Sequence, residues 1–426
     1  MIKFLTKGII RDRSRSLFPI LVITLTVAMI IAFQGFITGA FNGFFRDTAV
    51  VSTGHMKIMT RAYEEENQLL PNDLALLDTD KFIDKLNQQY PNHLWTPRIT
   101  FAGLLDVPDE NGETLEQGPV FALGIDFFSP SSRQKEIWDL ERKLIEGRLP
   151  ENKNEVLLSY KLANRLSLKL GESVTFIGST MHGAFTTCNF TMVGTFSLNM
   201  GPVDKQMMLL DISGARFALD MKDAASEILG YANSLYYDDQ ATIAVRQEYN
   251  NQIDSTDIFS PFMLALRDSN QMGTMVDLNN AMMAILLGIF MTIVMIVLWN
   301  MGLMNGLRRY GEIGMRLAIG ESKGHVYCSM MIEAVMIGVI GTIVGTALGI
   351  GLTYYLQEVG LDYTEAMEQL STTNIVMSNV FYAQVTPNLY YIGFIPGVLA
   401  TVFGTMLAGR AIYKREMAQL FKELET

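Results

Sequence analysis

The chain has 426 residues, 49% of them hydrophobic, and a formal net charge of −11 at pH 7. The acidic balance argues against a nucleic-acid partner, because nucleic-acid binding requires a basic surface. Four long apolar stretches exclude a soluble enzyme, and they also exclude an outer-membrane barrel, whose strands would alternate over about 10 residues.

Each of these stretches is long enough to cross a bilayer as a helix. A hydrocarbon core of about 30 Å needs about 20 apolar residues. The four stretches together contain one formally charged residue, Glu333. The predicted transmembrane helices are residues 17–40, 278–303, 329–356 and 389–409.

The distribution of Lys and Arg predicts on which side of the membrane each connecting segment lies. Residues 1–16 carry five, 304–328 and 410–426 carry four each, and 357–388 carries none. Basic residues that flank spans stay in the cytoplasm, so both termini are expected there. The interval 41–277 is then outside, and its 33 acidic and 20 basic residues give it a net charge of −13.

The N-terminal segment predicts both an anchor and a membrane-surface helix. Residues 1–16 alternate apolar and basic side chains, which suits an amphipathic helix on the inner leaflet as well as simple topology determination. The charge-free run 16–45 is far longer than the 7–15 residues of a signal-peptide core. We therefore expect the first span to be retained in the membrane.

The interval 41–277 predicts a mixed α/β domain between the first and second transmembrane helices. The expected strands are His55–Thr60, Trp95–Leu105, Val120–Ile125, Glu155–Ser159, Ser173–Gly178, Thr186–Phe196, Gln206–Asp211 and Ala241–Val245. The expected helices are Asp80–Gln89, Tyr160–Leu166, Ile212–Leu219 and Ala224–Ala232. A turn-rich segment at 108–119 predicts a first lobe and a small β-rich second lobe. The first lobe comprises 41–110 and 205–277, and the second about 115–204.

No catalytic constellation stands out in this interval. His55, His93 and His182 are scattered and have no metal-ligand spacing. The chain also contains no GxxxxGK[ST] loop, so ATP hydrolysis through a P-loop of its own is excluded. We expect no catalytic residue and no metal site.

The cytoplasmic segment 304–328 is the most informative part of the chain. Glu312–Ile319 predicts a short helix, too short and too charged to span the membrane, which Gly320 ends. It is either a plain connection or a docking helix for a cytoplasmic partner.

Residues 309–320 (RYGEIGMRLAIG), followed by Ile332–Ala334 at the start of a glycine-rich span, resemble the MacB/FtsX-like superfamily of ABC transporter permeases. Residues 147–196, from GRL to FTMVGTF, are similar to the family's extracytoplasmic domain, and the tail 409–421 is similar to its basic end.

Within the superfamily, the layout is most similar to lipoprotein-releasing (LolC/LolE-type) permeases. Thr53–Tyr63 (TGHMKIMTRAY) resembles the segment that follows their first span, whereas the loop 357–388 is long for that subgroup.

The resemblance implies a permease subunit of a mechanotransmission (type VII) ABC transporter in the bacterial inner membrane. It implies a second permease, identical or paralogous, and two copies of a cytoplasmic ABC ATPase. That ATPase would hold ATP and Mg²⁺, and this chain would hold no cofactor. Because the chain begins 16 residues before its first span, the ATPase is expected to be a separate protein. The substrate would be a lipoprotein, passed to a periplasmic carrier.

The coupling helix would rest in a groove of the ATPase and transmit its closure. The residues expected to couple are Arg309, Glu312, Ile313, Gly314, Arg316, Ala318, Gly320 and Lys323.

A row of aromatic residues on one face of the first span has two interpretations. It either packs against lipid and protein, or it lines an acyl-chain cavity together with methionines of the second span, whose side chains adapt to variable shapes. The candidate cavity residues are Phe33, Phe36, Ile37, Phe41, Phe44, Met282, Met283 and Leu286.

Gly341, Gly345 and Gly349 recur every four residues in the third span, a spacing that lets helices approach closely. We expect them to pack within the permease. Glu333 near the inner end is either a functional intramembrane carboxylate or a static ion-pair partner at the interface.

Three other functions remain open at this point. One is a MacB-like exporter of peptides or drugs from the periplasm. Another is an FtsX-like transmembrane regulator of cell-wall hydrolases. The last is a sensor without an ATPase.

Overall fold

The computed structural model describes residues 13–109, 112–198, 203–253, 257–269, 272–308, 310–363 and 380–414. The chain divides into two compact units. We call Met1–Phe41, Leu278–Asp362 and Phe381–Thr426 the helical unit, and Asn42–Asp277 with Tyr363–Val380 the sheet unit.

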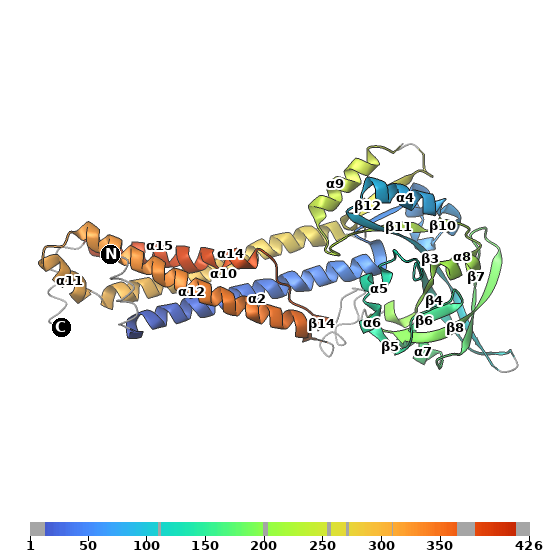
Figure 1. Ribbon diagram of the computed structural model, residues 1–426, viewed down its shortest axis with the longest axis horizontal. Helices are drawn as coiled ribbons and strands as arrows, with labels where there is room; N and C mark the ends of the chain where they lie inside the picture. Colours follow the sequence, from blue (N-terminus) through green and yellow to red (C-terminus); the bar gives the residue numbers. More distant parts are fainter. Residues whose placement is uncertain are drawn as a thin grey trace. The chain divides into compact units, whose positions relative to one another are not determined.

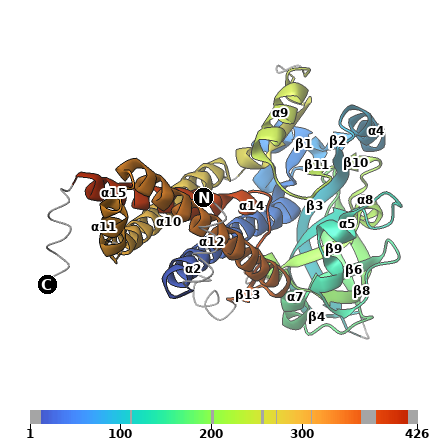
Figure 2. The ribbon, with the colours of Figure 1, turned by 60° about the vertical axis from the view of Figure 1, so that its left-hand side comes forward.

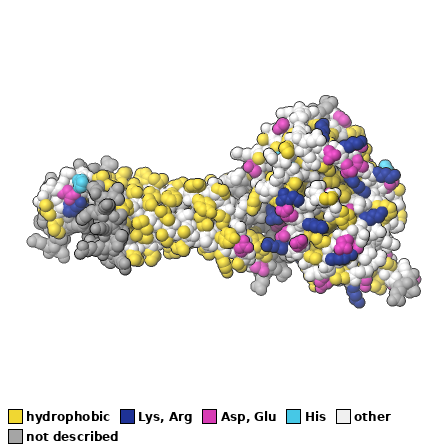
Figure 3. Space-filling view, in the orientation of Figure 1, with side chains coloured by type: hydrophobic (Ala, Val, Ile, Leu, Met, Phe, Trp, Pro, Cys, Tyr) yellow, Lys and Arg dark blue, Asp and Glu magenta, His cyan; other side chains and the backbone are white. Residues whose placement is uncertain are grey.

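Within the described residues, four helical segments are long and apolar enough to cross a membrane, which confirms the predicted fold class. They are Leu17–Thr53, Met272–Val297, Lys323–Val359 and Leu389–Leu407. Hydrophobic side chains cover their visible surface, whereas charged side chains gather on the sheet unit (Figure 3). Each of the four begins within six residues of the predicted position.

The first three spans are built from long helices, whereas the fourth is interrupted (Figure 1). Their bounds are α2 Arg13–Thr48, the π-helix η1 Ala49–Thr53, α10 Met272–Arg308, α11 Tyr310–Ala318, α12 Lys323–Val359, α14 Leu389–Ile392, the π-helix η6 Ile395–Ala400 and α15 Thr401–Lys414. Two short strands, β13 Leu361–Asp362 and β14 Val380–Phe381, follow α12 and pair with each other. The fourth span is broken into three pieces, and Pro396 opens its π-helical turn.

The sheet unit contains one large mixed sheet. Its strands are β1 Met56–Thr60, β3 His93–Pro108, β4 Thr114–Ile125, β5 Leu144–Gly147, β6 Glu155–Ser159, β7 Ser173–Ser179, β8 Phe185–Phe196, β9 Met207–Asp211, β11 Glu227–Ala232 and β12 Pro261–Ala265. Their order is β12-β1-β11-β3-β4-β9-β6-β8-β5, and β7 pairs with β3 and β8. The pairs β4/β9 and β6/β8 are parallel, and the other described pairs are antiparallel.

Short helices and a two-stranded sheet cover the large sheet. The strands are β2 Leu76–Leu77 and β10 Ala224–Ala225. The helices are α3 Arg61–Glu65, α4 Thr79–Gln89, α5 Gln134–Ile137, α6 Leu140–Lys143, α7 Tyr160–Arg165, α8 Ile212–Leu219 and α9 Asp239–Asn250. The 3₁₀ turns are η2 Asn67–Leu69, η3 Asn72–Leu74, η4 Val203–Lys205 and η5 Leu266–Asp268. Figure 2 shows α9 beside β1 and α4 beside β2 and β10.

Two of the predicted elements are wrong. Ala241–Val245 lies inside helix α9, because Asp238 caps that helix by accepting a hydrogen bond from the Ala241 amide. Ala224–Ala232 forms strands β10 and β11 instead of a helix. Strand β11 lies between β1 and β3 and is buried almost throughout, so pairing and burial override the helix propensity of its alanine.

The apolar core separates into two clusters that differ from the two predicted lobes. One cluster joins β1, α4, β11, α9 and β12 through Ile58, Leu86, Ile228, Tyr249 and Met263. The other cluster contains Phe176, Phe190, Leu210 and Leu219. Strand β9 and helix α8, which the sequence prediction placed in the first lobe, therefore pack in the second cluster.

Candidate functional site

Helix α11 ends in a tight turn that leads directly into α12. Gly320 has φ +97°, a backbone conformation that glycine adopts without steric cost. The Glu321 amide donates to the carbonyl of Arg316 (3.1 Å), and the Gly320 amide donates to that of Leu317 (3.1 Å). These two bonds form a Schellman motif. Ser322 then caps α12 by accepting from the His325 amide.

The same turn is closed by an ion pair. Arg316 donates from Nε and Nη2 to the two carboxylate oxygens of Glu321, at 2.7 and 2.8 Å. The guanidinium of Arg316 holds the pKa of Glu321 below its ordinary value. In most Schellman motifs a hydrophobic contact joins these two positions, and here a bidentate charge pair replaces it.

Helix α11 packs on α12 by one apolar side chain and exposes others. Leu317 is buried against Val326, with Met330 beside them. Met315 is 62% exposed and Ile319 is 83% exposed. The turn therefore presents apolar side chains outward on a short helix whose end is fixed by hydrogen bonds and an ion pair.

The structure places the predicted coupling residues in different situations. Gly320 forms the turn, Ala318 is exposed, Arg316 pairs with Glu321, and Lys323 starts α12. Gly314 is buried in α11, and a Cβ there would meet nothing within 4 Å. Arg309 lies outside the described residues, as do the side chains of Glu312 and Ile313.

A small apolar cavity lies between α2 and α10. It is lined by Ile30, Phe33, Gln34, Ile37, Met283, Leu286, Leu287 and Phe290. The rings of Phe33 and Phe290 are 4.8 Å apart. The cavity has a volume of only about 10 Å³, roughly one water molecule, so it is nearly closed.

Four of the predicted cavity residues lie here, namely Phe33, Ile37, Met283 and Leu286. Phe36 and Phe41 are half-buried on α2 away from this lining, and Met282 is exposed. Phe44 is buried against Phe45 in the sheet unit. The sequence prediction missed Ile30, Gln34, Leu287 and Phe290, because it did not fix how α10 is rotated relative to α2.

The glycine row of the third span lies in the contact with α2. A Cβ on Gly341 would lie 2.8 Å from Ile23, one on Gly345 would lie 2.7 Å from the Thr24 carbonyl oxygen, and one on Gly349 would lie 2.8 Å from Ile31. These distances are shorter than real Cβ contacts, so only glycine permits this approach. Glu333 is half-buried on α12 and has an interaction partner.

The fourth span joins this contact through its own glycines. A Cβ on Gly393 would lie 2.8 Å from Val27, and one on Gly397 would collide with the Thr342 hydroxyl. Ile23, Val27, Ile31 and Leu389 form the shared apolar core. Spans one, three and four thus form a close-packed group.

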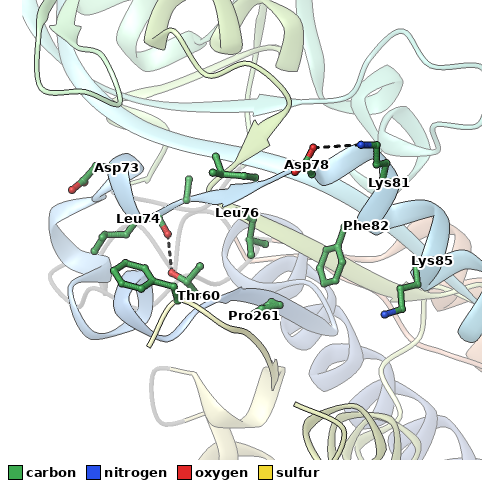
Figure 4. Close-up of a pocket in the computed structure, with 12 residues that line it drawn as sticks. Thr60, Asp73, Leu74, Leu76, Asp78, Lys81, Phe82, Lys85 and Pro261 are labelled. Atoms are coloured by element: carbon green, nitrogen blue, oxygen red, sulfur yellow. Dashed lines mark hydrogen bonds and ion pairs between the residues drawn. The ribbon is translucent and has the colours of Figure 1, made fainter. Parts of the chain in front are cut away.

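The sheet unit has an open pocket of about 610 Å³ beside β2 and α4 (Figure 4). Leu74, Leu76, Phe82 and Pro261 supply apolar walls. Asp73, Asp78, Lys81 and Lys85 also line it. Since two acidic and two basic side chains balance, the pocket shows no charge preference. Among the described residues, no group of three His, Cys, Asp or Glu side chains is placed to hold a metal ion.

Comparison with known proteins identifies the C-terminal part. Residues 284–417 match the family model described as FtsX-like permease C-terminal. The chain is 36% identical over 86 residues to a macrolide export ATP-binding/permease protein, MacB 1/2, from Paracoccus denitrificans. That match covers 18% of this chain and 13% of the relative's length. Over residues 284–417 the chain is therefore similar to FtsX-like permeases.

A solved structure also matches, the periplasmic region of MacB from Actinobacillus actinomycetemcomitans. The identity is 15%, and the match covers 53% of this chain and 94% of that one with a TM-score of 0.35.

Proposed function

We propose that this chain, which contains an FtsX-like permease domain over residues 284–417, is a permease subunit of a mechanotransmission ABC transporter. Two copies of a separate ATPase would hydrolyse ATP with Mg²⁺ below a pair of permeases, identical or paralogous. The proposal places the chain in the bacterial inner membrane with both termini in the cytoplasm and the sheet unit in the periplasm.

The observation that carries this proposal is the exposed apolar tip of α11 within the matched domain. Met315 and Ile319 are exposed although they are large and apolar. The Schellman turn and the Arg316–Glu321 pair fix the end of the helix that presents them. A pre-formed helix loses little conformational freedom on binding, so it suits a groove on a cytoplasmic partner.

For the substrate, we propose lipoproteins extracted from the inner membrane and passed to a periplasmic carrier. Three acyl chains of about 16 carbons would cost about 40 kcal/mol to expose to water, so extraction requires an apolar path. Phe33, Ile37, Met283 and Leu286 would line that path. The cavity between α2 and α10 of one chain has a volume of only about 10 Å³, which is too small for an acyl chain. A second permease would therefore be needed to complete the chamber.

A MacB-like exporter is the second candidate function. It is favoured by the identity with the macrolide export protein. An FtsX-like regulator of cell-wall hydrolases is the third candidate, and it rests on the family match alone.

The first experiment is purification of the full chain from native membranes in mild detergent, followed by mass spectrometry. We expect an ABC ATPase together with triacylated lipoproteins. Recovery of an ATPase together with a periplasmic adaptor would favour the export function over lipoprotein release. Recovery of no ATPase would overturn the permease proposal as a whole.

Docking of the ATPase on the exposed tip of α11, formed by Met315 and Ile319, is tested in the same preparation. The double variant Met315→Glu, Ile319→Glu places two charges on the exposed tip and should abolish copurification of the ATPase. Phe217→Glu is the matched control, because Phe217 is an equally exposed apolar residue of the sheet unit, 65% exposed. If the ATPase still copurifies with the double variant, α11 is not the docking helix.

A further inference from the structure

The open pocket beside β2 and α4 lies wholly within the sheet unit and has a charged residue at each end (Figure 4). Asp73 lies at one end and Lys85 at the other, and Leu76 and Phe82 lie between them. The volume of the pocket is about 610 Å³. Sites for small ligands usually measure about 300–1,000 Å³. The pocket is therefore large enough for a small molecule.

The four charged side chains that line the pocket are not equivalent. Asp78 and Lys81, at the start of α4, form an ion pair with each other at 3.8 Å. The side chains of Asp73 and Lys85 make no ion pair or hydrogen bond with the residues that the structure describes. A ligand can therefore pair with one carboxylate and one ammonium group without displacing a partner from either.

The backbone on both sides of Asp73 is held in place. The Asn72 side chain donates from Nδ2 to the Thr100 carbonyl of β3 (3.1 Å). The Leu74 carbonyl accepts from the Thr60 hydroxyl of β1 at 2.7 Å (Figure 4). Both contacts join the turn η3 to the large sheet. The backbone at the carboxylate end of the pocket is thus positioned before a ligand binds, which lowers the entropy cost of binding.

Helix α4, which carries Lys85, is also held. Asp223 Oδ1 accepts from the Thr79 hydroxyl (3.0 Å) and from the Asp80 amide (3.1 Å) at the start of the helix. Leu86, the residue after Lys85, is 1% exposed and belongs to the core cluster of β1 and β11. Both ends of the pocket therefore come from segments that are anchored within the sheet unit.

The walls between the two charges are apolar. They are formed by Leu74, Leu76, Phe82, Phe259 and Pro261. A ligand that fits this arrangement carries an ammonium group at one end, a carboxylate at the other and apolar groups between them. The head group of a zwitterionic phospholipid does not fit, because no apolar group separates its two charges. An apolar peptide with free termini has the required order of groups.

We propose that this pocket binds short apolar peptides with both termini free. The α-amino group pairs with Asp73, the terminal carboxylate pairs with Lys85, and the side chains pack on the apolar walls. The net charge of such a peptide is zero, as is that of the four charged residues of the pocket. The inference concerns the sheet unit alone and does not rest on the proposed function.

Binding is measured by equilibrium dialysis of tritiated di-, tri- and tetraleucine against the full chain in lipid nanodiscs, with empty nanodiscs as the blank. An extended chain advances about 3.3 Å per residue, so the three peptides place their termini at three separations. We expect saturable binding of at least one of them, and about threefold or more weaker binding of the alanine peptide of the same length. Absence of saturable binding, or equal binding of the alanine peptide, overturns the proposal.

The variants Asp73→Asn and Lys85→Gln test which charge pairs with which terminus. N-acetylation should weaken binding of the best peptide to the wild type about threefold or more, and it should have no further effect in Asp73→Asn. C-amidation should behave in the same way with respect to Lys85→Gln. The control variants Asp84→Asn and Lys161→Gln change exposed residues outside the pocket and should bind the peptide as the wild type does.

Two results of this comparison would overturn the proposal. If the caps weaken binding in Asp73→Asn and Lys85→Gln as much as in the wild type, the termini are bound elsewhere. If a peptide capped at both ends binds as tightly as the free one, the pocket holds a segment inside a longer chain. Should one variant fail to fold, the other cycle still decides. The assay contains this chain without ATP or an ATPase, so failure of the proposed function does not affect its outcome.

Discussion

The side chains of Arg316 and Glu321 form a bidentate ion pair across the turn that joins α11 to α12. Gly320 lies between these two residues in the sequence, and its φ of +97° permits the turn. A residue expected to contact the ATPase therefore has a role within its own chain, since Arg316 fixes the direction in which α11 projects. Met315 and Ile319, which are exposed, are then the residues that would make the apolar contact with a partner.

We predict that Gly320→Ala weakens coupling without removing α11. An alanine at this backbone angle costs about 1–2 kcal/mol, so the turn should open and the helix should lose its fixed orientation. In the complex reconstituted from the permease and its ATPase, the rate of ATP hydrolysis that the permease stimulates is expected to fall several-fold. Gly324→Ala is the control, because Gly324 has no left-handed φ and a Cβ there meets nothing within 4 Å. Equal activity of the two variants would contradict the role of the turn.

The glycine row of α12 gives a second prediction. Gly345→Ala would place a methyl group 2.7 Å from the Thr24 carbonyl oxygen, and backbone cannot move aside as a flexible side chain can. Overpacking of this kind costs about 1–3 kcal/mol. We expect a lower thermal unfolding midpoint of the purified protein.

Gly351→Ala is the matched control on the same helix, because a Cβ at Gly351 meets nothing within 4 Å. Its unfolding midpoint should equal that of the wild type. If Gly345→Ala were as stable as Gly351→Ala, the approach of α12 to α2 would be looser than the structure describes.

The third prediction concerns pH. Burial lowers the pKa of His55 to about 4, with smaller contributions from His93 and Arg46. The unfolded chain, with a histidine pKa near 6.5, then binds the proton first as the pH falls. The contribution of His55 to the free energy of unfolding is therefore fully present above pH 6.5 and is lost between pH 6.5 and 4, by about 3 kcal/mol in total.

The measurement is the unfolding midpoint as a function of pH in the wild type and in His55→Asn. Asparagine offers an acceptor for the Ala232 amide but does not titrate in this range, so the decline below pH 6.5 should become shallower. His182→Asn removes an exposed histidine and should leave the decline as it is. A decline that is identical in His55→Asn would assign it to other groups.

The sequence predicted the parts of the fold that depend on local pattern. The four spans follow from apolar length, and α11 with its end at Gly320 follows from propensity and glycine chemistry. Strand β11 was missed because a strand between two others is buried on both faces and loses the alternation that identifies strands. Helix α9 was missed because Thr242 and Val245 are β-branched and the cap at Asp238 was overlooked.

The long-range contacts of Arg98 could not be predicted in the same way. Arg98 acts on carbonyls 46 to 48 positions earlier and on Glu227, 129 positions later. Every residue has a backbone carbonyl, so the sequence does not indicate which carbonyls a given arginine will bind. One indication was present, because Arg98 stands inside the predicted strand Trp95–Leu105, where a charge among apolar residues requires a partner.

The last prediction concerns Arg98 of β3, which is buried, donates to Glu227 of β11 at 2.7 Å and also donates to the carbonyls of Val50, Val51 and Ser52. Arg98→Met removes the cation and leaves the Glu227 carboxylate buried without it, together with three carbonyls. Breaking a buried pair in this way costs about 3–5 kcal/mol. In the double variant Arg98→Met, Glu227→Gln the buried charge is gone, so the double variant should be more stable than Arg98→Met alone. Unfolding of four proteins in the same detergent, the wild type, Arg98→Met, Glu227→Gln and the double variant, measures the coupling energy, expected at about 1–3 kcal/mol. If the costs of the two single substitutions simply add in the double variant, the two side chains do not depend on each other. Arg98 would then act only as a cap on the carbonyls at the end of η1.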